Sequence, residues 1–175
     1  MRSGRTVQVF VAVLLLILLG FGTYVDATPT GKPNNTSDCG CHSGGSGLAT
    51  PSHNFPSEYN PGDLYSITIG VTSSSISGSG GGFSLTANKG SFSNAGSNAK
   101  IVNGDPTHSN NNARSWTVDW TAPTTGSGSV NIALAVLAAN GGNGNSNDGW
   151  GTTTHSISEA GDNQPPSVSN LIVSP

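Results

Sequence analysis

The fold of this chain is decided by Ser115-Trp116-Thr117-Val118-Asp119-Trp120-Thr121, in which polar and apolar residues alternate without a break. Successive side chains of an extended strand point to opposite faces, so Trp116, Val118 and Trp120 share one face. Two tryptophans on the same strand face indicate a large apolar core beside that strand. The following Ala122-Pro123 ends the strand, because proline has no N–H to donate to a strand ladder. The stretch therefore predicts a strand that is buried on one face.

Other stretches show the same alternation or a short apolar run, and turn-forming residues separate them. Further strands are predicted at Leu64–Thr72, Gly82–Ala87, Lys89–Val102, Ser129–Ala139 and Thr152–Ser158. Residues 73–82 are nearly all Ser and Gly and predict a flexible connection. Short strands joined by turns predict an all-β fold, an antiparallel immunoglobulin-like β-sandwich.

Composition narrows the range of functions. Only 9% of the 175 residues are charged, the net charge is −3, and no basic cluster follows the N-terminus. A nucleic-acid partner is not expected, because such binders carry a concentrated basic surface. The nine acidic residues are scattered, and no Gly-x-Ser-x-Gly or His-Glu-x-x-His pattern occurs. We therefore expect a protein that is not an enzyme.

The N-terminus has the pattern of an export signal. Arg2 and Arg5 precede an apolar run from Val9 to Phe21, and Val25-Asp26-Ala27 offers small residues where a signal peptidase cleaves. Residues 1–27 are predicted to be a signal peptide, or an uncleaved N-terminal anchor that would hold the chain to a membrane. In both cases the remainder is expected to be secreted or at the cell surface, in an oxidising compartment.

The exported part divides into three regions by composition. Residues 28–61 are rich in Pro, Asn, Ser and Gly and lack hydrophobic periodicity, which predicts an irregular N-terminal arm. Residues 62–160 contain the predicted strands and form the β-sandwich domain. Residues 161–175 include Pro165-Pro166 and are linker-like.

The arm carries both cysteines of the chain in the run Cys39-Gly40-Cys41-His42. A Cys-x-x-Cys-His run is the attachment signature of c-type haem, in which two thiols add to porphyrin vinyl groups and the histidine binds iron. The run found here is one residue shorter. Cα atoms at i and i+2 of an extended chain are roughly 6–7 Å apart, close to the spacing across one helical turn, so two thioethers remain within reach. The Cys41-His42 adjacency also allows a haem held by a single thioether.

Two other interpretations of the cluster remain open. In an exported protein, Cys39 and Cys41 can close a small strained disulfide, which Gly40 would ease and which would be readily reduced. Alternatively, the two thiolates and His42 bind a Zn or Cu ion, with another histidine as the fourth ligand. The loop at residues 143–149 has one carboxylate, Asp148, and is interpreted as a turn and not as a Ca²⁺ site.

Several motifs, taken in order, resemble the bacterial and archaeal Reeler-like extracellular domains, also called choice-of-anchor domains. The resemblance is carried by Thr28–Pro33, Asp38–Gly44, Phe55–Gly62, Gly82–Ala87, Thr107–Ser109 and Trp116–Pro123. The most specific of them is Trp120-Thr121-Ala122-Pro123. The resemblance spans residues 28–158. It implies a surface-exposed β-sandwich, commonly part of a larger anchored protein and in many members preceded by Cys-x-x-Cys-His.

With haem bound, Cys39 and Cys41 would be thioether donors and His42 the proximal iron ligand. Candidates for the sixth ligand in the exported chain are His53, His108 and His155. His108 ranks first because it lies in a Thr-His-Ser loop at a position that the resemblance marks, whereas His155 lies on a predicted strand. The alternative is a histidine from a neighbouring subunit, which would make the chain assemble.

Two functions follow from these alternatives. With haem c, the chain would be an extracytoplasmic electron-transfer module whose partner is a redox protein or a surface-layer component. With a Cys39–Cys41 disulfide or a small metal site instead, it would be a non-catalytic cell-surface domain for adhesion or matrix binding. Low charge and abundant Thr, Ser and Asn suit either function.

Overall fold

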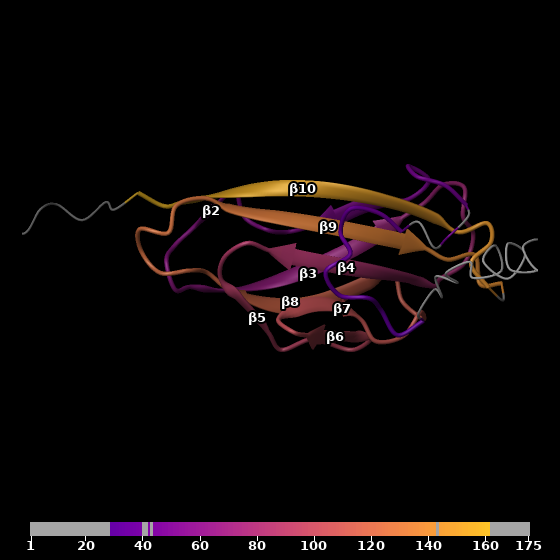
Figure 1. The fold of residues 1–175 in the computed structure, drawn as a ribbon, viewed down its shortest axis with the longest axis horizontal. Coiled ribbons are helices and arrows are strands. Elements are labelled where there is room, and N and C mark those ends of the chain that lie inside the picture. Colours follow the sequence, from indigo (N-terminus) through magenta and orange to yellow (C-terminus); the bar gives the residue numbers. More distant parts are fainter. Residues whose placement is uncertain (1–28, 40–41, 43, 143, 162–175) are drawn as a thin grey trace, which may run out of the picture.

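The computed structural model describes residues 29–39, 42, 44–142 and 144–161. The predicted signal peptide (1–27), Cys41 and the tail from residue 162 onwards lie outside the described residues. The described part is a sandwich of two β-sheets (Figure 1), which confirms the all-β prediction. Within it, no helix is long and apolar enough to cross a membrane.

Four strands form one sheet, in the order β1 (Thr50–His53), β3 (Leu64–Thr72), β8 (Ser115–Thr121) and β5 (Ser91–Ser93). Six form the other, in the order β2 (Glu58–Tyr59), β10 (Gly149–Glu159), β9 (Val130–Ala138), β4 (Gly81–Ala87), β7 (Asp105–His108) and β6 (Ala99–Val102). Adjacent strands are antiparallel, except that β2 runs parallel to β10. The antiparallel prediction therefore fails only for this short edge pair.

The core lies between the sheets and centres on β8. Trp116, Val118 and Trp120 are buried on its inner face, as their alternation predicts. The Trp120 ring lies edge-on to Phe55 and Tyr59, with a centroid separation of 5.9 Å in each pair. Edge-to-face aromatic pairs contribute about 0.5–1.5 kcal/mol beyond the area they bury. Because Tyr59 belongs to β2, this cluster joins the two sheets.

Two short strands lie within the region predicted as an irregular arm. β1 pairs with β3, and β2 ends at Tyr59, whose side chain is fully buried. Their four and two residues are too few for a recognisable alternation. Before residue 50, the described residues form no strand and contribute only the single bridge Ser46–Trp150. The irregular part of the arm is therefore shorter than predicted, as far as it is described.

His108 is predicted in a loop but is the last residue of β7. β7 pairs with β6 across the turn Asn103-Gly104, where both residues have positive φ, 53° and 92°. Asn-Gly favours such two-residue turns because both residues tolerate the left-handed backbone. The hairpin, and not a loop, therefore sets the position of His108.

The arm runs along the outer face of the six-stranded sheet, where it covers β4 (Figure 1). Asn35 N donates a hydrogen bond of 3.0 Å to Ser84 Oγ on β4. Gly31 packs so closely on β7 that a Cβ there would lie 2.3 Å from His108 O. The first five residues of β4 are consequently all buried, although only alternate side chains reach the core.

Trp120→Ala is expected to lower the free energy of unfolding by about 3–5 kcal/mol, the usual cost of truncating a buried tryptophan. Urea denaturation followed by circular dichroism measures this loss. Leu64→Ala is the control: Leu64 is 60% exposed, and its truncation should change stability by less than about 0.5 kcal/mol. An equally small loss for Trp120→Ala would contradict a core centred on β8.

Two of the candidate histidines pack against each other at the edge of the core. His53 of β1 and His155 of β10 have ring centroids 4.8 Å apart. His155 Nε2 donates a hydrogen bond of 2.9 Å to Pro56 O. His53 Nδ1 is buried and has no hydrogen-bond partner among the described residues. Burial, and secondly the neighbouring His155, lower the pKa of His53 below its usual 6.5.

Stability should therefore fall as the pH drops below 6.5. The unfolded chain takes up a proton at His53 with the ordinary pKa, whereas the folded chain takes it up only at lower pH. Between the two pKa values the unfolded state binds more protons, so acid favours it. Denaturation midpoints measured at several pH values between neutrality and the folded-state pKa should fall less for His53→Gln than for the wild type. Identical pH profiles for the two proteins would refute this role of His53.

Candidate functional site

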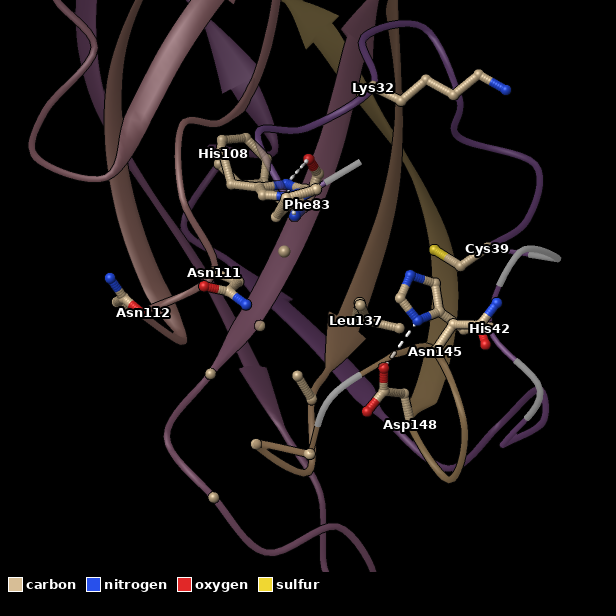
Figure 2. A pocket seen from close by; sticks show the side chains of 18 of the residues that line it. Lys32, Cys39, His42, Phe83, His108, Asn111, Asn112, Leu137, Asn145 and Asp148 are labelled. Carbon is tan, nitrogen blue, oxygen red and sulfur yellow. Dashed lines mark hydrogen bonds and ion pairs between the residues drawn. The ribbon is translucent and has the colours of Figure 1, made fainter. Parts of the chain in front are cut away.

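A pocket of about 920 Å³ lies between the arm, the start of β4 and the loop that joins β9 to β10 (Figure 2). Its volume is near the upper end of the roughly 300–1,000 Å³ that is usual for small-molecule and cofactor sites. Its walls contain polar and apolar residues, among them Cys39, His42, Phe83, His108, Leu137 and Asp148. Segments that are far apart in the sequence therefore meet at one cavity.

The pocket brings together three of the four residues predicted to bind haem. Cys39 and His42 line it from the arm, and His108 lines it from the end of β7. Figure 2 shows Cys39 and His42 on one side of the pocket and His108 on the other. The fourth residue, Cys41, lies outside the described residues. His53 and His155 are not among the residues that line this pocket.

The ring of His42 is held by a buried carboxylate. Its Nδ1 lies 2.8 Å from Asp148 Oδ2. An ionised carboxylate only accepts hydrogen bonds, so Nδ1 donates, and in the neutral imidazole Nε2 then keeps a lone pair. In Figure 2 the second ring nitrogen of His42 points away from Asp148. Metal-ligating histidines typically show this arrangement, with one nitrogen bound to a carboxylate and the other available to the metal.

Asp148 is a site residue that sequence patterns do not reveal. Its side chain accepts hydrogen bonds at both oxygens, from His42 Nδ1 and, over 2.9 Å, from Asn140 N. The carboxylate therefore closes the loop between β9 and β10 and ties that loop to the arm. His42 is 106 residues away in the sequence, and no local spacing connects the two. The signal that could have marked Asp148 is its position as the single carboxylate of an Asn/Gly loop.

His108 contacts the backbone of Phe83 through its Nδ1. Phe83 N lies 3.0 Å from this atom and Phe83 O lies 3.1 Å from it. The two contacts require opposite protonation states: the N–H donates only to a bare Nδ1, and the carbonyl accepts only from a protonated one. With the proton on Nδ1, the lone pair is on Nε2, as a metal ligand requires.

The floor of the pocket is rich in glycine and is fixed by an arginine. Residues 78–82 line the pocket and belong to the segment predicted to be a flexible connection. The Arg114 guanidinium donates hydrogen bonds to Ile76 O, Gly80 O and Ala139 O over 3.0–3.1 Å. These bonds connect the segment to Ala139, the residue that follows β9. A Cβ on Gly82 would lie 2.6 Å from His108 Cε1, so glycine is needed there for the ring to fit.

The other interpretations of the cysteine cluster stay predictions. The described residues contain no group of three or more Cys, His, Asp and Glu side chains that could hold a metal ion. Both a Zn or Cu site and a Cys39–Cys41 disulfide also require Cys41, which lies outside those residues.

The pocket contains side chains of the kinds that attach and ligate haem c. A thiol and an imidazole on one wall, with a second imidazole on another wall, are the donor types that attach and ligate haem c. Leu137 and Ala139 supply apolar surface, and the glycine and serine residues 78–82 line the pocket without bulky side chains.

Solved structures that are similar to this chain include two reeler domains. Fragment 2 of the human F-spondin reeler domain shares 19% identity and covers 66% of this chain and 95% of its own, with a TM-score of 0.47. The Reelin-N domain of F-spondin shares 18% identity, covers 75% and 94%, and gives a TM-score of 0.49. No protein-family model and no curated protein matches the chain.

Gly82→Ala is expected to displace the His108 ring and to destabilise the protein by about 1–3 kcal/mol, as overpacking usually does. The check combines thermal unfolding with NMR of the His108 ring. Gly161→Ala is the matched control, because a Cβ at Gly161 would meet no atom within 4 Å. If Gly82→Ala left the His108 resonances and the stability unchanged, the close packing of these two residues would be refuted.

Proposed function

We propose that this chain is an exported haem c-binding β-sandwich that transfers electrons outside the cytoplasm. The observation that carries the proposal is the convergence of Cys39, His42 and His108 on one pocket large enough for a cofactor. Their order in the sequence does not require them to meet. The Cys41-His42 adjacency, placed after a predicted export signal, supports the same conclusion.

The roles follow from the donor atoms. Cys39, Cys41 or both would hold the porphyrin through thioethers, His42 would be the proximal ligand through Nε2, and His108 would be the distal ligand. The proximal role is supported by Asp148, which keeps the proton of His42 on Nδ1. For the distal role, His108 would be in the tautomer whose Nδ1 carries the proton and donates a hydrogen bond to Phe83 O.

The other wall residues would set the surroundings of the cofactor. Leu137 and Ala139 would exclude water from one side of the pocket, which would lower the local dielectric constant around the cofactor. The exposed Lys32 lines the pocket and offers a cation for the carboxylates of a porphyrin. A bound haem would supply one-electron chemistry, with iron cycling between the ferrous and ferric states. Its partner would be a redox protein or a surface-layer component, which receives or donates the electron.

Expression in a host with haem-maturation machinery tests the proposal. The purified protein should show a Soret band and a covalent haem stain after denaturing electrophoresis. His42→Ala and the double variant Cys39→Ala/Cys41→Ala should lose at least about 90% of the bound haem, because ligand and attachment are removed. His108→Ala should retain covalent haem but change the spectrum, because the sixth ligand is lost.

His155→Ala is the matched control and should load haem as the wild type does, since His155 does not line the pocket. A colourless protein with an intact Cys39–Cys41 disulfide, from a host with active haem-maturation machinery, would contradict the proposal. That result would favour the adhesion or matrix-binding function instead.

A further inference from the structure

We infer that Asp148 is a positioning residue for the iron ligand His42, which it holds in one tautomer and makes a stronger electron donor. The inference deepens the proposed function and rests on it. It assigns to Asp148, a residue without a motif of its own, control over the reduction potential of the site.

The geometry of the pair fixes the tautomer. Asp148 Oδ2 lies 2.8 Å from His42 Nδ1, within the range of charge-assisted hydrogen bonds. The acceptor holds the proton on Nδ1 and leaves the lone pair on Nε2, on the far side of the ring from Asp148 (Figure 2). Without this partner, a neutral imidazole would exchange between both tautomers, and only one of them could bind iron through Nε2.

The carboxylate is itself held rigidly. Asp148 is 2% exposed, and its second oxygen accepts a hydrogen bond from Asn140 N over 2.9 Å. The arm packs directly on its backbone two residues after His42, because a Cβ on Gly44 would lie 1.4 Å from Asp148 O. Glycine at position 44 therefore lets the arm approach closely enough for the hydrogen bond to form. The pair acts as a fixed unit and not as a surface ion pair between mobile chains.

The electronic consequence has a definite direction. A carboxylate partner gives the imidazole more negative character, which stabilises ferric iron relative to ferrous iron. Burial strengthens the effect, because little water screens the charge. The reduction potential should therefore be lower with Asp148 than with a neutral residue of the same shape.

The first test uses the full exported chain isolated without haem. In ¹⁵N NMR spectra of the His42 ring, the wild type should show the Nδ1–H tautomer alone, and Asp148→Asn should show a mixture. Asp148→Glu is the second variant if Asp148→Asn does not fold: it keeps the charge, but its longer chain moves the carboxylate and should also shift the tautomer ratio. A wild-type ratio in a folded variant would overturn the inference.

The second test measures the reduction potential of the haem-loaded protein. Asp148→Asn should raise the potential and make His42 about 10- to 100-fold easier to displace by an added ligand such as imidazole. The control is Asp119→Asn, which removes a charge from β8 in the other sheet and should change neither quantity. Unchanged values in Asp148→Asn would overturn the inference. If no haem binds, the proposed function fails, and the NMR measurement still decides whether Asp148 orients His42.

Discussion

The burial of β4 on both of its faces is the constraint on which the site depends. Phe83 and Leu85 pack into the core, while the outer face is covered by the arm, which hydrogen-bonds to Ser84. A strand covered on two sides needs small or apolar residues in succession, and its first residues, Gly81-Gly82, meet that need. The pocket exists because the arm covers this strand and leaves a space above the glycine floor.

Local patterns located the long strands, although β10 extends beyond the predicted Thr152–Ser158 at both ends. They were insufficient for the short ones: the strand predicted at Lys89–Val102 is two strands, β5 and β6, which belong to different sheets. The alternation of β8 gave its bounds and its buried face, because each side chain faces one side of a sheet. β2 and β7 have only two and four residues, which is too few to show an alternation of polar and apolar side chains. Where they form is determined by the strands with which they pair. His108 was found as a candidate through a resemblance and not through its setting, which the Asn103-Gly104 hairpin defines.

From local patterns, the sequence could predict only those site residues that lie next to one another in the chain. The two cysteines beside a histidine identify the arm as a candidate site from the sequence alone. Asp148 could not be recognised in this way, since its hydrogen bond to His42 spans 106 residues. Arg114 is a similar case: its contacts with Gly80 O and Ala139 O shape the pocket floor, yet a lone arginine before a strand carries no pattern. Long-range hydrogen bonds become visible only after the sheets are assembled.

The arm is synthesised before the strands on which it packs, because it precedes them in the chain. A chain made from its N-terminus presents Cys39 and His42 before β4, β7 and Asp148 exist. During that interval both residues belong to an extended peptide and not to a cavity wall. An enzyme that modified Cys39 during this interval would therefore meet a linear substrate, before the sandwich is complete.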